Sequence, residues 1–195
     1  MQRIVLASSN PGKVAEFNLL LADSGFEVVT QASLGVEDAE ETGLSFVENA
    51  LLKARHAARA TGLPALADDS GLCVDHLRGA PGLYSARYAG KHGDNAANNA
   101  KLLRELDGVP PEQRGAFFIC VLALIRHADD PAPLIAEGRW HGHVLGETRG
   151  VQGFGYDPLF VADGQSASAA ELDPSLKSRI SHRGQALSRL RAQLG

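Results

Sequence analysis

The stretch Ala65–Val74, which reads ALADDSGLCV, decides how the rest of the sequence is interpreted. An apolar run ends at two adjacent carboxylates, a hydroxyl and a glycine, and a second apolar run follows. Because side chains alternate along a strand, Asp68 and Asp69 point the same way only if the chain turns, and Gly71 permits a turn there. The pattern predicts a strand that delivers acids to a sheet edge, as an ordinary polar turn or as a site for a hard divalent cation.

Length and composition favour one globular domain. The chain has 195 residues, enough to bury a sizeable core, so we expect a single domain over residues 1–195. Its hydrophobic content of 44% is typical of globular proteins. A formal charge of −4 argues against a nucleic-acid coat or a polybasic membrane anchor, so no nucleic-acid or membrane partner is expected.

The apolar runs and the cysteines predict the compartment. Cys73 and Cys120 both lie inside apolar runs, which is typical of buried thiols rather than of a disulfide framework. The N-terminal apolar run is too short for a signal peptide, and the longest run, residues 116–125, is too short to span a membrane. We therefore expect a cytoplasmic protein.

The N-terminal segment has the order strand, small-residue loop, helix. Residues 3–7 form a short apolar run, Ser8-Ser9-Asn10-Pro11-Gly12-Lys13 follows, and residues 14–21 are amphipathic. Such a loop offers backbone amides to a phosphate, although the Walker spacing is absent and a plain turn between strand and helix is the alternative. Residues 26–31 are predicted to form the second strand.

A helix is predicted to begin after Ser45. Ser45 and Glu48 have the spacing of a capping box, apolar residues then repeat with helical period, and Gly62 with Pro64 ends the helix. Glu48 is accordingly interpreted as a cap. Glu40 and Glu41, in the loop before it, have no such structural role, so they are either solvated or functional.

The second half of the chain predicts a hairpin. Asp94 is expected to cap a helix through residues 98–106, and residues 116–125 form a long buried strand. Residues 129–133 turn the chain back into residues 134–140, which predicts antiparallel strands in addition to the parallel start and thus a mixed sheet. The His141 and His143 pair lacks a nearby third ligand, so a transition-metal site is not favoured.

Two further segments carry functional residue types. Between residues 150 and 160, glycines allow close approach to a ligand and Phe154 offers a face for stacking, although a turn packed into the core fits equally well. Near the C-terminus, Ser181 is expected to cap a helix. Lys177, His182 and Arg183 would then lie at or before its N-terminus, where cations are unfavourable, and this conflict favours a functional role.

Taken together, the motifs resemble the inosine triphosphate pyrophosphatase family, in particular its bacterial dITP/XTP pyrophosphatases. They occur in the family's order over essentially the whole chain: Ser8–Lys13, Glu40-Glu41-Thr42-Gly43, Asp68-Asp69-Ser70-Gly71, Phe154-Gly155-Tyr156-Asp157-Pro158 and Ser181-His182-Arg183-Gly184. Ser9 departs from the pattern, because many members carry glycine there. The resemblance implies an α/β fold with a mixed twisted sheet flanked by helices, two lobes with a central cleft, and a homodimer.

The resemblance also implies an activity. Members hydrolyse ITP, dITP and XTP, which arise by deamination of purines, to the monophosphate and pyrophosphate with Mg²⁺ as cofactor, and so cleanse the nucleotide pool. Glu40 and Asp69 would hold the metal. Asp69, supported by Asp68, would also act as the base, or else would only hold the metal and leave activation of the water to it, because a metal-bound carboxylate has a lowered pKa. The implied substrate-binding residues are Ser8, Ser9, Asn10, Pro11, Gly12, Lys13, Ser70, Phe154, Gly155, Tyr156, Asp157, Lys177, His182 and Arg183.

Selectivity has a partial physical explanation. Hypoxanthine and xanthine present an acceptor at position 6, whereas adenine presents a donor, so a donor such as Arg183 matches only the former. An unmatched buried polar group costs about 1–3 kcal/mol, which corresponds to roughly tenfold to hundredfold discrimination. Guanine also has a 6-oxo group, so its rejection must arise elsewhere.

Two alternative functions stay open for the sequence. One is a Maf-type nucleotide pyrophosphatase of other specificity, and the other is a sensor that binds a triphosphate without cleaving it.

Overall fold

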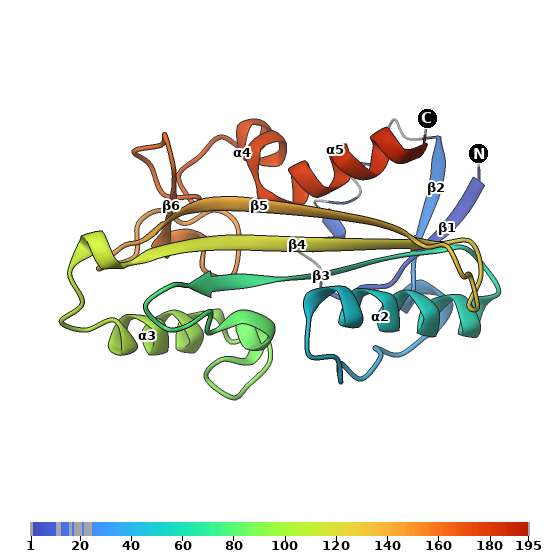
Figure 1. The fold of residues 1–195 in the computed structure, drawn as a ribbon, viewed down its shortest axis with the longest axis horizontal. Coiled ribbons are helices and arrows are strands. Elements are labelled where there is room, and N and C mark those ends of the chain that lie inside the picture. Colours follow the sequence, from blue (N-terminus) through green and yellow to red (C-terminus); the bar gives the residue numbers. More distant parts are fainter. Residues whose placement is uncertain (1, 11–12, 16, 18–20, 22–24, 195) are drawn as a thin grey trace. The chain divides into compact units, whose positions relative to one another are not determined.

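The computed structural model describes residues 2–10, 13–15, 17, 21 and 25–194. Its strands are β1 (Gln2–Leu6), β2 (Phe26–Thr30), β3 (Ala65–Val74), β4 (Gly115–Ile125), β5 (Leu134–Val144) and β6 (Phe160–Ala162). Its helices are α2 (Phe46–Thr61), α3 (Asn95–Glu105), α4 (Pro174–Ile180) and α5 (His182–Leu194), as traced in Figure 1.

The six strands form one mixed sheet in the order β2-β1-β3-β4-β5-β6. Strand β1 is parallel to both β2 and β3, with Val5 opposite Val29 on one side and opposite Ala65 on the other. Strand β6 is antiparallel to β5. The predicted α/β class with a mixed sheet flanked by helices is therefore confirmed.

The chain divides into two compact units. Unit 1 comprises residues 1–69, 120–138 and 183–195, and unit 2 comprises residues 70–119 and 139–182. This division agrees with the predicted two lobes. The central cleft and the assignment of residues 1–195 to a single domain stay predictions.

In unit 1, helices α2 and α5 lie on opposite sides of the strands (Figure 1). The predicted capping box starts α2: Ser45 Oγ accepts from the Glu48 amide at 3.4 Å and donates to the Glu48 carboxylate at 2.7 Å. Gly62 ends the helix with a left-handed φ of 68°. Helix α5 packs Ala186, Leu187 and Leu190 into the core of this unit, which also contains side chains of β1, β3 and β4.

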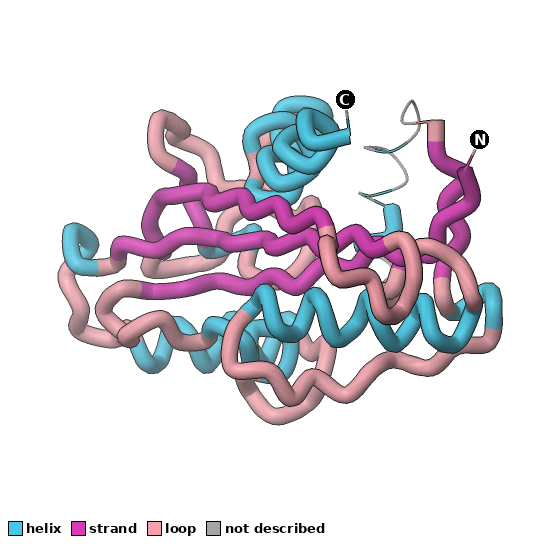
Figure 2. The backbone as a smooth tube through the Cα atoms, turned by 45° about the vertical axis from the view of Figure 1, so that its right-hand side comes forward, coloured by secondary structure: helices cyan, strands magenta, loops and turns pink. Residues whose placement is uncertain are grey.

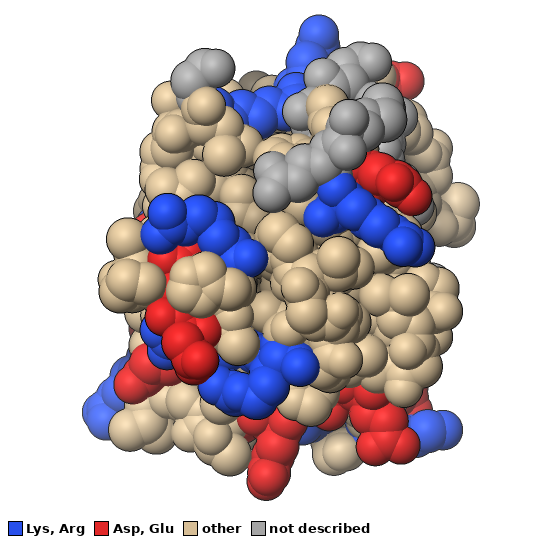
Figure 3. Space-filling model, turned by 90° about the vertical axis from the view of Figure 1, so that its right-hand side faces the viewer, with Lys and Arg blue, Asp and Glu red and all other residues tan. Residues whose placement is uncertain are grey.

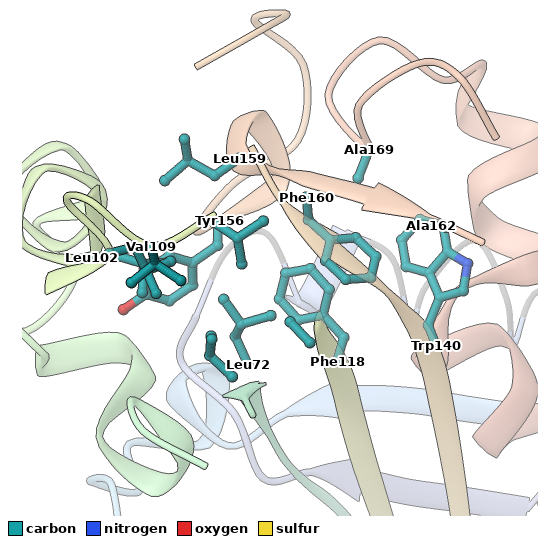
Figure 4. Close-up of a cluster of buried hydrophobic side chains, with 14 of the residues drawn as sticks. Leu72, Leu102, Val109, Phe118, Trp140, Tyr156, Leu159, Phe160, Ala162 and Ala169 are labelled. Carbon is teal, nitrogen blue, oxygen red and sulfur yellow. The ribbon is translucent and has the colours of Figure 1, made fainter. Parts of the chain in front are cut away.

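The core of unit 2 is built around aromatic side chains (Figure 4). The rings of Phe118 and Phe160 meet edge to face with centroids 4.8 Å apart, and Trp140 packs on Phe160 at 5.3 Å. Helix α3 adds Leu102, and its predicted cap is present, because the Asp94 side chain accepts from the Ala97 amide at 3.0 Å.

Strand β5 extends beyond the predicted end at Trp140 to Val144. Gly142 allows this extension, because β6 passes so close that a Cβ there would lie 2.1 Å from the Val161 carbonyl oxygen. The predicted hairpin is confirmed by the neighbouring positions of β4 and β5. Its turn is fixed by Asp130, which accepts from the amides of Arg126 at 2.9 Å and Ala132 at 3.0 Å.

The predicted turn at Asp68–Gly71 is wrong. Strand β3 runs without interruption through residues 65–74, and Figure 2 shows it as a continuous strand. Asp68 and Asp69 consequently point to opposite sides of the sheet, because successive side chains of a strand alternate. A strand tolerates two buried carboxylates here because each has cationic partners from elsewhere in the chain, which the local pattern does not reveal.

Among the described residues, no helix combines the length and the apolar character needed to cross a membrane.

Candidate active site

The first carboxylate of β3, Asp68, lies between two cations of unit 1. Its Oδ2 is 2.9 Å from Lys13 Nζ and 3.9 Å from Arg183 Nη2. Asp68 and Arg183 are 1% and 3% exposed. Burial alone would raise the pKa of Asp68, but the charges of Lys13, Arg183 and Lys53 outweigh it and hold the pKa well below the usual range. Asp68 is therefore a permanent anion that fixes Lys13 and Arg183.

The second carboxylate, Asp69, has different partners. Lys53 Nζ of α2 lies 2.7 Å from Asp69 Oδ1 and 2.9 Å from Glu41 Oε1. Burial raises the pKa of Asp69, while Lys53 opposes that shift. For Lys53, burial would lower the pKa, but the charges of Asp69, Asp68 and Glu41 prevail and raise it. Lys53 is thus a fixed cation between two carboxylates.

Asn49 completes the surroundings of Asp69. Its Nδ2 donates to Asp69 Oδ2 at 3.4 Å, and its Oδ1 accepts from the Gly43 amide at 2.8 Å. A Cβ at Gly43 would lie 2.6 Å from Asn49 Oδ1, so only glycine fits this close approach. Helix α2 therefore connects the loop that carries Glu41 to Asp69 through both Asn49 and Lys53.

The predicted phosphate loop is organised by its own side chains. Ser8 Oγ accepts from the Asn10 amide at 3.3 Å, and Asn10 Oδ1 accepts from the Lys13 amide at 3.2 Å, where the helical residues begin. Ser9 donates to Asp38, which also accepts from Gln31. Pro11 and Gly12, which were also predicted to bind substrate, lie outside the described residues.

Asp38 joins the phosphate loop to the acidic loop that contains Glu40 and Glu41. Glu40, the predicted metal ligand, is exposed on this loop, whereas Glu41 contacts Lys53. The same loop is held on α2 by His56, whose Nε2 lies 2.9 Å from the Glu37 carbonyl oxygen. The structure therefore brings Glu41, rather than Glu40, to the cation that contacts Asp69.

In unit 2, the predicted nucleotide-binding residues Phe154, Asp157 and Lys177 contact one another. Asp157 Oδ2 accepts from the Phe154 amide at 2.8 Å and from Lys177 Nζ at 2.7 Å. Lys177 Nζ also lies 5.7 Å from the centroid of the Phe154 ring. Lys177 lies before the last helix, as predicted, but within a separate short helix, α4, that the sequence analysis did not predict. Together these contacts fix the position of Phe154.

The side chains of Tyr156 and His182 belong to the core of unit 2. The Tyr156 hydroxyl donates to the Ser85 carbonyl at 2.9 Å. The His182 ring stacks on Phe118 with centroids 4.9 Å apart and an interplanar angle of 12°. The Gly155 carbonyl accepts from Asn99, and Ser70 is half-buried. His182 and Arg183 open α5, as expected, while Ser181 closes α4.

The predicted site residues thus fall into two groups. Lys13, Asp68, Asp69 and Arg183 belong to unit 1, whereas Ser70, residues 154–157, Lys177 and His182 belong to unit 2. Sequence reasoning missed Lys53 and Asn49. A signal was present, because both lie four residues apart on α2, beside the buried alanines of the same helix.

Two further observations concern possible metal ligands and the distribution of charge on the surface. Within the described part of the chain, no three His, Cys, Asp or Glu side chains are clustered as a metal site, and His141 and His143 are both exposed. On the face drawn in Figure 3, acidic and basic side chains are interspersed among uncharged ones.

Known proteins of similar sequence and structure identify the family. The model of the Ham1 family matches residues 4–193. A dITP/XTP pyrophosphatase of Yersinia pseudotuberculosis is 59% identical over 96% of this chain and 95% of its own length. The corresponding protein of Burkholderia pseudomallei is 59% identical over 99% of this chain and 93% of its own length.

The solved structure of a HAM1 protein from Coxiella burnetii has a TM-score of 0.91 and 52% identity, covering 100% of this chain and 98% of that one. A second structure, of a nucleoside-triphosphatase, dITP/XTP pyrophosphatase, from Mycobacterium abscessus, has a TM-score of 0.78 and 47% identity, covering 97% and 98%. These matches agree with the family resemblance found in the motifs and favour it over the Maf-type alternative. The chain belongs to the Ham1 family.

Proposed function

We propose that this protein hydrolyses the deaminated purine nucleoside triphosphates ITP, dITP and XTP between the α and β phosphates, releasing the monophosphate and pyrophosphate. The observation that carries this proposal is the 59% identity to a dITP/XTP pyrophosphatase over 96% of the chain. The charged residues of unit 1 support it, because they supply the cations and carboxylates that the reaction needs.

The phosphates bind to groups that Asp68 and the first loop hold in place. Lys13 supplies an ammonium group, and Ser8, Ser9, Asn10 and Ser70 supply hydroxyls and amides. Because Asp68 pairs with Lys13 and Arg183 at 2.9 and 3.9 Å, both cations are oriented before a polyanion arrives. Such preorganisation reduces the rearrangement that binding requires. Asp68 is therefore assigned to the positioning of Lys13 and Arg183.

The acidic residues fit a magnesium ion. Mg²⁺ is usually held by one or two carboxylates together with substrate phosphates, so a ready-made cluster of three protein ligands is not required. Asp69 and Glu41 already converge on one cation, the Lys53 ammonium, at 2.7 and 2.9 Å. Asp69 and Glu40 would hold the metal, with Glu41 on the same loop. Bound Mg²⁺ would neutralise phosphate charge and lower the pKa of a water molecule.

Asp69 is assigned as the group that orients the attacking water and takes its proton. Its Oδ1 is occupied by Lys53, which leaves Oδ2, the oxygen bonded to Asn49, as the proton acceptor. Burial raises the pKa of Asp69 and so favours proton uptake, whereas a metal held by the same carboxylate would oppose that shift, so part of the activation of the water would fall to the metal. The water oxygen forms a new bond to a phosphorus atom. At the same time, the bond between this phosphorus and the oxygen that bridges the α and β phosphates breaks.

The base is assigned to the residues that the family resemblance implies for it. Phe154 supplies a face for stacking, and its position is fixed by Asp157 and Lys177. Arg183 supplies donors that match a 6-oxo purine, and His182, Gly155 and Tyr156 complete the nucleotide-binding set. Rejection of guanine requires a further feature at its 2-position.

The experiment is to incubate the protein and Mg²⁺ with ITP, XTP, GTP and ATP in parallel and to separate the products. Turnover of ITP and XTP to monophosphate and pyrophosphate, with much slower turnover of GTP and ATP, is expected. Release of orthophosphate and a diphosphate would contradict the proposal. Tight binding of ITP without turnover would identify a sensor instead. Omission of Mg²⁺ tests the metal requirement.

We further propose that the protein acts in the cytoplasm as a homodimer. The free, buried thiols of Cys73 and Cys120 fit a reducing compartment. Light scattering after size-exclusion chromatography would give a mass of two chains, and a mass of one chain would contradict the dimer.

A further inference from the structure

Asn99 of helix α3 holds the backbone of the segment that carries Phe154. Its side chain is 8% exposed, and its Nδ2 donates to the Gly155 carbonyl oxygen at 3.1 Å. Gly155 lies directly after Phe154, the residue proposed to stack on the base. One amide group of α3 therefore fixes the peptide that follows the stacking residue.

Hydrogen-bond chemistry decides which atom of the Asn99 side-chain amide faces Gly155. If Asn99 were rotated, its oxygen would face the carbonyl oxygen of Gly155, so Nδ2 must be the atom that faces it. The other atom, Oδ1, is buried and has no hydrogen-bond partner among the described residues. A buried asparagine with an unmatched acceptor weakens a helix interior, where leucine would suit both the helix and the core. A local conflict of this kind is expected at functional positions.

The contacted segment needs an external anchor. Gly155 has a φ of +64°, in the left-handed region that glycine enters freely, so its own residue type does little to fix the loop. Besides the contacts of Asp157 with Phe154 and Lys177, two side chains anchor this part of the chain: Asn99 binds the Gly155 carbonyl, and the Tyr156 hydroxyl binds the Ser85 carbonyl at 2.9 Å. Of these two, only Asn99 acts on the residue next to Phe154.

The preceding residue, Asn98, binds the backbone of residues 85–89. It accepts from the Ala89 amide at 2.7 Å and donates to the carbonyls of Ser85 at 3.4 Å and Ala86 at 3.3 Å. Asn98 has every polar atom satisfied and thus has a structural role. Asn99 differs, because its Oδ1 has no hydrogen-bond partner among the described residues and its Nδ2 donates to the segment that carries Phe154.

We infer that Asn99 is a positioning residue for base recognition: through the Gly155 carbonyl it sets the orientation of the Phe154 ring. This inference rests on the proposed function and names a residue that determines how its substrate is recognised. Asn99 belongs to unit 2, together with Phe154, Asp157 and Lys177, whereas the residues assigned to the phosphates are mainly in unit 1. Its effect should therefore appear in binding of the base and not in the chemical step.

The test uses Asn99→Leu, which removes the donor while keeping a similar volume, and Asn95→Ala as a control on the exposed first turn of the same helix. For Asn99→Leu we expect the KM for ITP to rise about tenfold, with kcat changed less than about threefold, as the loss of one hydrogen bond predicts. The KM for ATP should rise by a similar factor, because stacking on Phe154 does not distinguish between bases. The Tm should stay close to that of the parent protein, because removal of the unmatched Oδ1 acceptor offsets the loss of the hydrogen bond to the Gly155 carbonyl.

Separate outcomes distinguish this inference from the proposed function. If the parent protein does not release pyrophosphate from ITP, both are wrong. If it does, and Asn99→Leu lowers only the Tm or lowers kcat equally for all substrates at constant KM, Asn99 is merely structural. If Asn99→Leu does not fold, Asn99→Asp decides the matter, because its carboxylate repels the Gly155 carbonyl and should give the same rise in KM. An unchanged KM in Asn99→Asp would overturn the inference.

Discussion

Lys53 Nζ lies 2.7 Å from Asp69 Oδ1, so a cation from helix α2 contacts the carboxylate assigned as the base. The same nitrogen is 2.9 Å from Glu41, which makes Lys53 the link between the acidic loop and strand β3. A buried carboxylate without this partner would be protonated more readily, because burial raises its pKa. Lys53 therefore opposes protonation of Asp69 and binds one of its two carboxylate oxygens.

Replacing Lys53 should abolish turnover. In Lys53→Gln, Asp69 and Glu41 lose their shared cation, so we expect kcat for ITP to fall by at least about a hundredfold. The free energy of unfolding should fall by about 3 kcal/mol, because a buried charge is left unpaired. Urea denaturation and steady-state kinetics measure both quantities. The control is Lys91→Gln, at an exposed loop position. Normal turnover by Lys53→Gln would show that Lys53 is not needed for catalysis.

Asp68 should contribute to stability in a pH-dependent way. Its folded-state pKa is depressed by Lys13, Arg183 and Lys53 against the effect of burial, so its contribution is present above its ordinary pKa of 3.8. That contribution is lost as pH falls through the lower folded-state value. We therefore expect Asp68→Asn to be less stable than the parent at pH 7, with a difference that shrinks progressively below about pH 4. Denaturant titrations at several pH values test this, and a constant difference would contradict it.

Arg183 should determine the preference for 6-oxo purines by its shape as well as its charge. Arg183→Lys keeps a cation near Asp68 but loses the planar set of donors. We expect the ITP to ATP ratio of kcat/KM to fall about tenfold, as the loss of one matched hydrogen bond predicts. Competition between the two substrates measures this ratio directly. An unchanged ratio would move recognition of position 6 to other residues.

Tyr156 should make the protein sensitive to alkaline pH. Burial, together with Tyr88 and Glu105, raises the pKa of Tyr156 above its ordinary value of 10.0. Its stabilising effect is complete below that value and is lost as pH rises toward the folded-state pKa. In Tyr156→Phe, the bond to the Ser85 carbonyl is lost, so stability at pH 7 should drop by about 1 kcal/mol. The decline above pH 10 should become shallower in this variant, and an equally steep decline would be evidence against the assignment.

Local signals predicted most of the helices and strands. The capping box at Ser45 and Glu48 placed the start of α2 correctly, because its hydrogen bonds involve residues three apart in sequence. The cap at Asp94 predicted α3 for the same reason. Helix α4 was missed, although Asp173 followed by Pro174 is a typical start of a helix.

Long-range pairs decided the features that the sequence could not predict. The sequence predicts a turn at Asp68 and Asp69, whereas the structure has a strand there, because the cations that pair with these carboxylates, Lys13 and Lys53, are distant in sequence. Glu41 was not assigned, since its contact with Lys53 depends on how the acidic loop lies on α2. Motif order, in contrast, was enough to identify the family, because it does not depend on knowing these contacts.

The proposed function requires cleavage between the α and β phosphates of ITP. Phosphorus-31 NMR of a reaction containing the protein, Mg²⁺ and ITP measures it most directly, with Asp69→Asn as the matched inactive variant. We predict that the ITP resonances are replaced by those of IMP and pyrophosphate, and that Asp69→Asn folds normally but leaves ITP intact. Resonances of IDP and orthophosphate, or equal turnover by Asp69→Asn, would contradict the account.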